Sequence, residues 1–254
     1  MAKATIKSPR EVELMRESCR IVGDVLRLLK QYIRPGITTQ ELDTIAEDYI
    51  RSQNAEPAFK GYGSNKQNLF PASLCTSIDD EVVHGIPGNR KLQEGDIISI
   101  DVGVKKNEFY GDGAWTFPVG KISDDKLHLM NTTEESLLLG IAQARAGNRV
   151  QDISAAVQSR VEQDGYSVVR DLVGHGVGRS LHEDPPVPNY VQTGASHMLQ
   201  KGMTIAIEPM VNAGAYRVRM DRDGWTVRTS DGSPSAHFEH TILVTENEPE
   251  ILTQ

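Results

Sequence analysis

A central β-hairpin is predicted for Glu94-Gly-Asp-Ile-Ile-Ser-Ile-Asp-Val-Gly-Val-Lys-Lys-Asn-Glu-Phe-Tyr-Gly-Asp-Gly113. The apolar run 97–104 is typical of a mostly buried strand. The polar residues 105–108 predict the turn, where Asn107 tolerates the left-handed backbone that tight hairpins need. From Phe109 the chain is expected to run back antiparallel to the first strand.

Two aspartates of this hairpin favour a metal site. If the loop is Lys106-Asn107, or all of residues 105–108, Asp101 and Asp112 become direct cross-strand partners on one face. Their Cβ atoms would then lie about 5 Å apart. Two like charges beside an apolar strand repel each other and resist desolvation, and a bound cation removes both penalties. The alternative is a pair of exposed residues at the strand ends.

Size and composition are those of an ordinary globular protein. The chain has 254 residues, 38% of them hydrophobic and 24% charged, which is enough for one large domain or two small ones. A net charge of −8 offers no basic surface for nucleic acid or an anionic membrane. The N-terminal residues lack the apolar core of a secretory signal, and two cysteines are too few for a disulfide framework. We therefore expect a cytoplasmic protein without a membrane span.

Helix caps and apolar periodicity define the expected elements. Ser8 and Thr38 each begin a capping box, and Ser123 begins a third helix. The expected helices span about 8–33, 38–51, 123–146 and 150–163, and the further strands about 73–78, 166–170, 203–208, 225–229 and 237–245.

An internal repeat indicates two related halves. Residues 92–101 align without gaps on residues 199–208, and the helix pairs of the two halves correspond in the same order. A separation of about 110 residues favours a duplicated α/β unit over a solenoid. We therefore predict a single catalytic domain, 1–254, with pseudo-repeat halves of roughly 8–120 and 121–254. The alignment places Glu208 at the position equivalent to Asp101.

Further acidic and histidine residues complete a candidate site. Glu239 lies inside an apolar strand, where an ionised carboxylate is costly unless it is paired; the alternative is a solvent-facing position. His175 and His84 are glycine-flanked histidines, although a single histidine is more often structural or exposed. Four carboxylates and one histidine carry too much negative charge for one Zn²⁺ and suit two divalent ions bridged by carboxylates. No Gly-x-Ser-x-Gly elbow or dinucleotide-binding motif offers another chemistry.

These residues resemble those of the type I methionine aminopeptidases. The resemblance covers nearly the whole chain and rests on a set of motifs in one order: His84-Gly-Ile-Pro87, Gly95–Val102, Gly111-Asp112, Gly174–Arg179, His182-Glu183, Gly202–Val211, Asp223–Thr226 and Glu239-His-Thr241. It implies an α/β (α+β) pita-bread fold, with two pseudo-symmetric αβ halves around a mostly antiparallel sheet.

The resemblance also implies an activity and its cofactors. Such enzymes release the initiator methionine from nascent proteins whose second residue is small and uncharged, through a dinuclear metal-activated hydroxide. The implied cofactors are two divalent metal ions per chain, Co, Mn, Fe or Zn. The implied partners are nascent polypeptide N-termini, with transient ribosome contact, no nucleic acid or membrane binding, and a monomeric state.

Individual roles follow from the matching motif positions. The resemblance implies that Asp112 and Glu239 bridge the two ions, that Asp101 completes one ion, and that His175 and Glu208 complete the other. The same match makes Glu208 a proton relay and puts two histidines on the scissile peptide, His84 and His182.

The family's methionine pocket maps onto residues that could instead be plain core. These are Phe59, Tyr62, Phe70, Cys75, Leu181 and Trp225. Leu181 stands where an aromatic residue is common, and the loop 63–69 is longer than in compact relatives. The resemblance therefore implies the metal site but does not fix the pocket shape or the inhibitor preference. The alternatives are a proline-directed aminopeptidase of the same fold and a non-catalytic pita-bread module; intact metal ligands count against the second.

Overall fold

The computed structural model describes residues 4–254. Residues 1–3, which belong to the predicted domain and to the N-terminal segment expected to lack a secretory signal, lie outside the described part. The helices are α1 (Pro9–Lys30), α2 (Thr39–Ser52), α3 (Asp124–Gln143) and α4 (Val150–Gln163). The strands are β1 (Glu56–Pro57), β2 (Leu74–Ile78), β3 (Glu81–Val83), β4 (Ile97–Lys106), β5 (Phe109–Pro118), β6 (Ser167–Val168), β7 (Gly174–Gly176), β8 (Glu183–Val187), β9 (Thr204–Ile207), β10 (Met210–Asn212), β11 (Val218–Met220), β12 (Val227–Thr229), β13 (Ser235–His237), β14 (Glu239–Leu243) and β15 (Glu250–Ile251).

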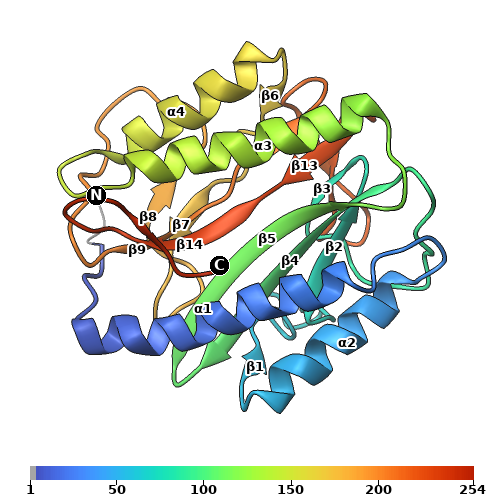
Figure 1. Cartoon of the computed structure of the whole chain (residues 1–254), viewed down its shortest axis with the longest axis horizontal. Helices are drawn as coiled ribbons and strands as arrows, with labels where there is room; N and C mark the ends of the chain where they lie inside the picture. The colour runs from blue at the N-terminus through green and yellow to red at the C-terminus, as the bar shows by residue number, and fades with distance from the viewer. Residues whose placement is uncertain (1–3) are drawn as a thin grey trace.

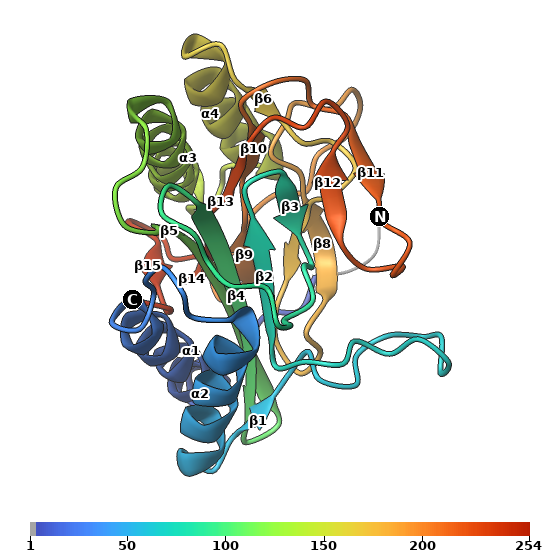
Figure 2. The same cartoon turned by 90° about the vertical axis from the view of Figure 1, so that its right-hand side faces the viewer.

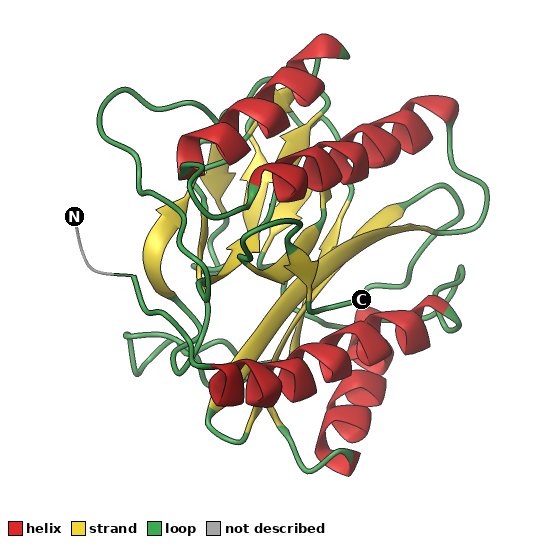
Figure 3. Cartoon of the chain, turned by 60° about the vertical axis from the view of Figure 1, so that its left-hand side comes forward, coloured by secondary structure: helices red, strands yellow, loops and turns green. Residues whose placement is uncertain are grey.

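The main sheet is antiparallel and has helices on one face only. Its strand order is β1-β4-β5-β14-β9-β7-β8, with β2 beside β4 and β15 beside β14. The helices cover one face as two pairs, α1 with α2 and α3 with α4 (Figures 1 and 3). Strands β3, β11 and β12 form a small sheet on the side opposite the helices (Figure 2). Strands β6, β10 and β13 form a second small sheet, which contacts α3 and α4. The predicted mixed α/β class with a mostly antiparallel sheet is confirmed.

The order of the central strands is symmetric. The repeated segments become β4 and β9, each of which pairs with the next long strand, β5 or β14, and these two strands pair with each other. The α1–α2 pair packs over the β4 side and the α3–α4 pair over the β9 side, and each pair encloses its own cluster of buried aliphatic residues. The two similar strand pairs, β4–β5 and β9–β14, therefore meet where β5 pairs with β14.

The helices begin where the caps predicted. Both capping boxes form, with the backbone N–H of Glu11 donating to Ser8 Oγ and that of Glu41 donating to Thr38 Oγ1. The apolar stripe of α1 is fully buried against β5. This close contact requires Gly111, because a Cβ atom there would lie 2.7 Å from the backbone nitrogen of Cys19. Helix α1 ends at Lys30, short of the predicted end near residue 33.

The central hairpin forms, but its predicted register was wrong. Its turn is Asn107-Glu108, with φ values of 50° and 64°, the left-handed conformation at both central positions that a type I′ turn requires. Asp101 therefore pairs with Ala114, and Asp112 pairs with Gly103. The two aspartates are diagonal neighbours on the same face rather than direct partners.

The predicted strand 237–245 is broken at Phe238. β13 pairs with β10 in a small sheet, whereas β14 pairs with β5 and β9 in the main sheet. Because the chain changes sheets here, Glu239 is the first residue of a central strand of the main sheet. Within residues 4–254, no helix is long and apolar enough to span a bilayer.

Candidate metal centre

One cavity is lined by every candidate site residue that was predicted from the sequence. It has a volume of about 220 Å³. The five predicted metal ligands, the two further histidines and the six predicted pocket residues all line it, together with Val83, Leu172, Val173 and Met210. Neither His237 nor His240 lines this cavity.

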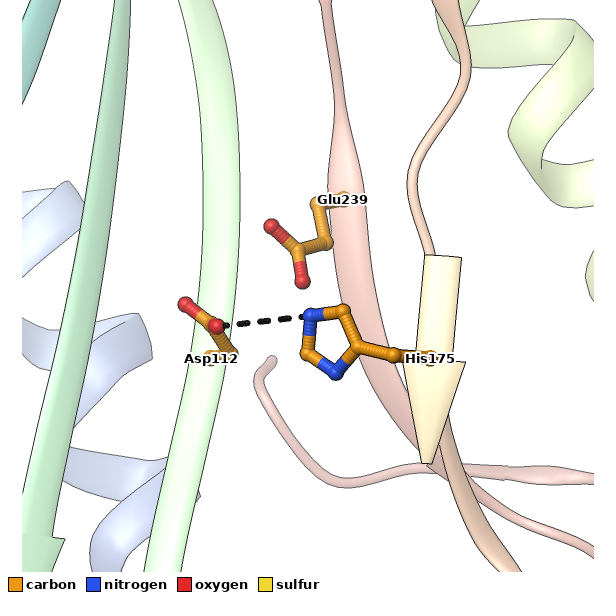
Figure 4. Close-up of side chains that lie close together, drawn as sticks. All are labelled: Asp112, His175 and Glu239. Carbon is orange, nitrogen blue, oxygen red and sulfur yellow. Dashed lines mark ion pairs between the residues drawn. The ribbon is translucent and has the colours of Figure 1, made fainter. Parts of the chain in front are cut away.

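The acidic residues reach the cavity from four central strands of the main sheet. Asp101 and Asp112 come from β4 and β5, Glu239 begins β14, and Glu208 follows β9. Ligand atoms of Asp112, His175 and Glu239 all lie within 4.8 Å of one another (Figure 4). His175 Nε2 lies 3.9 Å from Asp112 Oδ2 and 3.5 Å from Glu208 Oε1. The arrangement concentrates carboxylate oxygens around one imidazole nitrogen.

Backbone contacts fix which nitrogen of His175 faces this group. His175 Nδ1 lies 2.9 Å from the carbonyl oxygen of Gly176, so Nδ1 carries the proton and donates. Nε2 therefore presents its lone pair to the carboxylates, as a metal ligand must. Glycines flank this histidine because a Cβ atom at Gly174 or Gly176 would lie 2.4 Å from a backbone oxygen of a neighbouring strand.

The electrostatics of the cluster are unfavourable without a cation. Burial raises the pKa of Asp101 to about 7. Burial, and then the charges of neighbouring carboxylates, raise the pKa values of Asp112 and Glu239 well above the ordinary range. The pKa of Glu208 is raised in the same way. Burial lowers the pKa of His175 to about 3, so its imidazole is neutral at pH 7.

Three buried carboxylate oxygens of this cluster are orphaned. Across residues 4–254, no donor lies within hydrogen-bond reach of Asp101 Oδ1, Asp112 Oδ1 or Glu239 Oε1. Buried polar atoms in native proteins normally have a partner. Hard oxygen donors with one neutral imidazole are a donor set suited to divalent transition metals. The residues therefore fit a metal centre.

Two more histidines stand beside the cluster. The rings of His182 and His175 have centroids 4.2 Å apart, and His182 Nδ1 lies 2.8 Å from the Tyr62 hydroxyl. His84 has φ of 60°, an unusual backbone conformation for a residue other than glycine. Its neighbour Gly85 packs so closely on Thr76 that a Cβ atom would lie 2.1 Å from the carbonyl oxygen. Burial lowers the pKa of His84 to about 4, so this imidazole is also neutral at pH 7.

An apolar chamber adjoins the predicted metal ligands. Phe59, Phe70, Cys75 and Leu181 are buried in one cluster against Trp225. Phe59 and Phe70 meet edge to face with centroids 6.5 Å apart, and Phe70 meets Trp225 with centroids 5.3 Å apart. Tyr62 is 41% exposed and stands at the rim. The loop that carries Tyr62 closes over Trp225, because the side-chain amide of Asn68 donates to the carbonyl oxygen of Asp223 at 3.1 Å.

Comparison with known proteins identifies the family of this site. Metallopeptidase family M24 matches residues 13–246. Methionine aminopeptidase 1 of Bacillus subtilis is 53% identical over 248 residues, which cover 98% of both chains. The crystal structure of methionine aminopeptidase from Thermotoga maritima superposes with a TM-score of 0.95 at 45% identity, over 99% of this chain and 100% of that one. The chain belongs to the methionine aminopeptidases of metallopeptidase family M24.

The fold extends beyond the methionine aminopeptidases. Xaa-Pro dipeptidase from Bacillus anthracis superposes with a TM-score of 0.78 at 22% identity, and the match covers 98% of this chain but 62% of that one. At this identity the likeness shows the pita-bread fold alone. The full-length similarity to methionine aminopeptidases favours that family over the proline-directed alternative.

Four lining residues of this M24 peptidase escaped prediction from the sequence. Val83 precedes His84, Leu172 and Val173 precede the glycine-flanked His175, and Met210 follows Glu208 by two residues. The sequence offered one indication of them, because each lies within three residues of a predicted site residue. Whether such a neighbour faces the cavity depends on strand geometry that composition does not reveal.

Proposed function

We propose that this protein hydrolyses the N-terminal methionine from polypeptides whose second residue is small and uncharged, using two divalent metal ions. The observation that carries the proposal is the cluster of orphaned, buried carboxylate oxygens around neutral His175, beside an apolar chamber. Its high identity to methionine aminopeptidases over the full chain supports the same activity.

Two of the carboxylates occupy the positions suited to a bridge. Asp112 and Glu239 lie on the two adjacent central strands, β5 and β14, and both approach His175 Nε2. We assign them as shared ligands, with Asp101 completing one ion and His175 and Glu208 completing the other. Bound divalent ions would supply a nucleophile from water at neutral pH and Lewis-acid polarisation of the scissile carbonyl.

The chain's own groups handle the proton and the developing charge. The Glu208 side chain is 14% exposed and lines the cavity, so its carboxylate is placed to accept and return a proton there. His84 and His182 are the proposed contacts to the scissile peptide, one to the amide and the other to the carbonyl oxygen. The Tyr62 hydroxyl, at His182 Nδ1, orients that imidazole from the rim.

The apolar chamber is the proposed site for the methionine side chain. Phe59, Phe70, Trp225 and Cys75 offer the aromatic and sulfur surfaces that an unbranched thioether contacts favourably. Leu181 closes one wall with an aliphatic side chain. These residues wall the cavity as well as packing on one another, which supports binding over a purely structural role.

The remaining proposals concern the cellular setting. We infer that Co, Mn, Fe or Zn fills both positions, and that the protein works in the cytoplasm as a monomer on nascent chains, with transient ribosome contact. We also propose that it is one catalytic domain with related halves at about 8–120 and 121–254, which the symmetric strand order supports.

A peptide panel tests the proposed activity. Protein stripped with EDTA and reloaded with Mn²⁺, Fe²⁺ or Co²⁺ in turn should release methionine from Met-Ala-Ser and leave Met-Leu-Ser intact, because the second residue must fit beside the metal ligands. Free methionine is measured chromatographically. Cleavage of Ala-Pro-Ser with Met-Ala-Ser untouched would contradict the proposal and favour the proline-directed alternative.

A further inference from the structure

A buried ion pair joins the N-terminal segment to the residue next to His182. Lys7 lies just before α1, and its Nζ contacts Glu183 Oε2 at 2.7 Å. The Lys7 side chain is 2% exposed and that of Glu183 is 13% exposed. A lysine side chain is almost never buried this fully unless its ammonium group is paired. The burial of both side chains therefore indicates that the ammonium group of Lys7 serves to hold the Glu183 carboxylate in place.

The pair lies against the turn that carries two cavity residues. This turn, residues 177–182, connects β7 to β8 and contains Leu181 and His182. Glu183 uses its second oxygen, Oε1, to accept the backbone N–H of Ser180 at 3.2 Å. One carboxylate therefore holds the turn with one oxygen and the N-terminal segment with the other.

Close packing leaves this turn no room to shift toward the pair. A Cβ atom at Gly178 would lie 2.4 Å from Glu183 Oε1 and 2.6 Å from Lys7 Cε. On its other side the turn is attached to the central hairpin, since the backbone N–H of Tyr110 donates to the carbonyl oxygen of Gly178 at 2.9 Å. The turn is clamped between Lys7 and β5.

Lys7 is itself anchored to the main sheet. Its backbone N–H donates to the carbonyl oxygen of Gly202 at 2.8 Å, and the N–H of Gly202 donates to the carbonyl oxygen of Val244 at 3.0 Å. Gly202 leads directly into β9, whose following residue is the metal ligand candidate Glu208. The ammonium group thus ties the His182 turn to the same strand that positions Glu208.

We propose that Lys7 is a positioning residue for His182, which it holds in place through Glu183 so that the imidazole meets the scissile peptide. The inference rests on the proposed function, because it requires that His182 contact the substrate. It adds a residue of the N-terminal segment, 175 positions before His182 in the sequence, to the groups on which turnover depends.

Replacing the ammonium group isolates this role. Lys7→Met keeps the length of the side chain and removes the charge, so we expect a drop of about tenfold in kcat/KM on Met-Ala-Ser, as displacement of a substrate-contacting group produces. Mn²⁺ affinity, measured by calorimetry, should be unchanged because the five ligand candidates are untouched. Lys201→Met is the matched control: Lys201 also pairs with a glutamate, Glu246 at 3.1 Å, but it is 67% exposed, and its loss should leave the rate unchanged.

A double-mutant cycle separates positioning from general stability. In a His182→Ala background, Lys7→Met should cause no further loss of kcat/KM, because the group it positions is gone. A further tenfold loss in that background would overturn the inference. The variant Lys7→Met/Glu183→Gln removes the unpaired buried carboxylate, so its thermal midpoint should return toward that of the wild type while its rate stays low.

The same double variant covers the case in which Lys7→Met alone does not fold. Full recovery of kcat/KM together with stability would show a purely structural pair and would overturn the inference. Wild-type rates in Lys7→Met would overturn it as well, with the proposed function intact. A wild-type protein that releases no methionine from Met-Ala-Ser would instead count against the proposed function.

Discussion

Asp112→Asn should lower kcat on Met-Ala-Ser by more than about 100-fold. Loss of a residue that only hydrogen-bonds a metal ligand costs at most about 100-fold. Asp112 lies on β5, and one of its carboxylate oxygens lies within 4.8 Å of the ligand atoms of His175 on β7 and Glu239 on β14. An amide offers a single weakly donating oxygen and cannot bridge two cations. Initial rates at saturating Mn²⁺ measure the effect.

The same substitution should stabilise the metal-free protein. The amide carries no ionisable proton, so it escapes the penalty that burial, and then the neighbouring carboxylates, place on the ionised form of Asp112 and that raises its pKa. The thermal midpoint in EDTA should therefore rise while activity falls, a combination that general damage to the fold does not give. Asp125→Asn, an exposed aspartate of α3, is the control and should change neither quantity. Undiminished activity in Asp112→Asn would remove its assignment as a bridging ligand.

The second large effect is a pH-dependent stability that metal ions abolish. The folded, metal-free protein retains protons on four buried carboxyl groups. Burial raises the pKa of Asp101 to about 7, and it also raises those of Asp112, Glu208 and Glu239 well above their ordinary values. The unfolded chain releases those protons near pH 4. The stability that these carboxyl groups contribute is therefore complete below about pH 4, and it is lost as the pH rises through their pKa values in the folded protein.

The histidines act in the opposite sense and in another pH range. Burial lowers the pKa values of His175 and His84 to about 3 and about 4, so the unfolded chain gains protons below about pH 6.5 that the folded chain does not accept. Their contribution is present above that pH and lost below it. Between pH 7 and 8.5 the histidine contribution changes little, and the buried thiols of Cys19 and Cys75, whose pKa values burial raises, act in the same direction as the carboxyl groups.

Urea unfolding between pH 7 and 8.5 measures this effect. In EDTA the free energy of unfolding should fall by up to about 1.4 kcal/mol per pH unit for each carboxyl group that still holds its proton. With saturating Mn²⁺ the slope should fall to the contribution of the buried thiols of Cys19 and Cys75, because the cation takes the place of the carboxyl protons. Equal slopes with and without Mn²⁺ would show that the orphaned oxygens do not hold metal.

Local sequence signals predicted much of the architecture. The capping boxes at Ser8 and Thr38 fixed the starts of α1 and α2, because each satisfies backbone groups within four residues. The internal repeat pointed to Glu208 as the counterpart of Asp101, and both line the cavity. The glycines beside His175 were informative because they reflect close backbone contacts.

Features set by distant packing were not predictable in this way. The hairpin turn includes Glu108 at φ of 64°, where turn propensity favours glycine. Its register is held by contacts outside the hairpin, since Gly103 must leave room for Phe59 and Gly111 must leave room for Cys19. The Lys7–Glu183 pair joins residues 176 apart, and no local pattern marks it.

We propose that carboxylates carried by β4, β5 and β14 and by the residue after β9 hold two ions side by side with His175. Anomalous diffraction from crystals grown with Mn²⁺ tests it most directly. We expect two peaks in the cavity, both contacting Asp112 and Glu239, one also contacting Asp101 and the other His175 and Glu208. Peaks only outside this cavity, or ions that leave Asp112 and Glu239 uncoordinated, would contradict it.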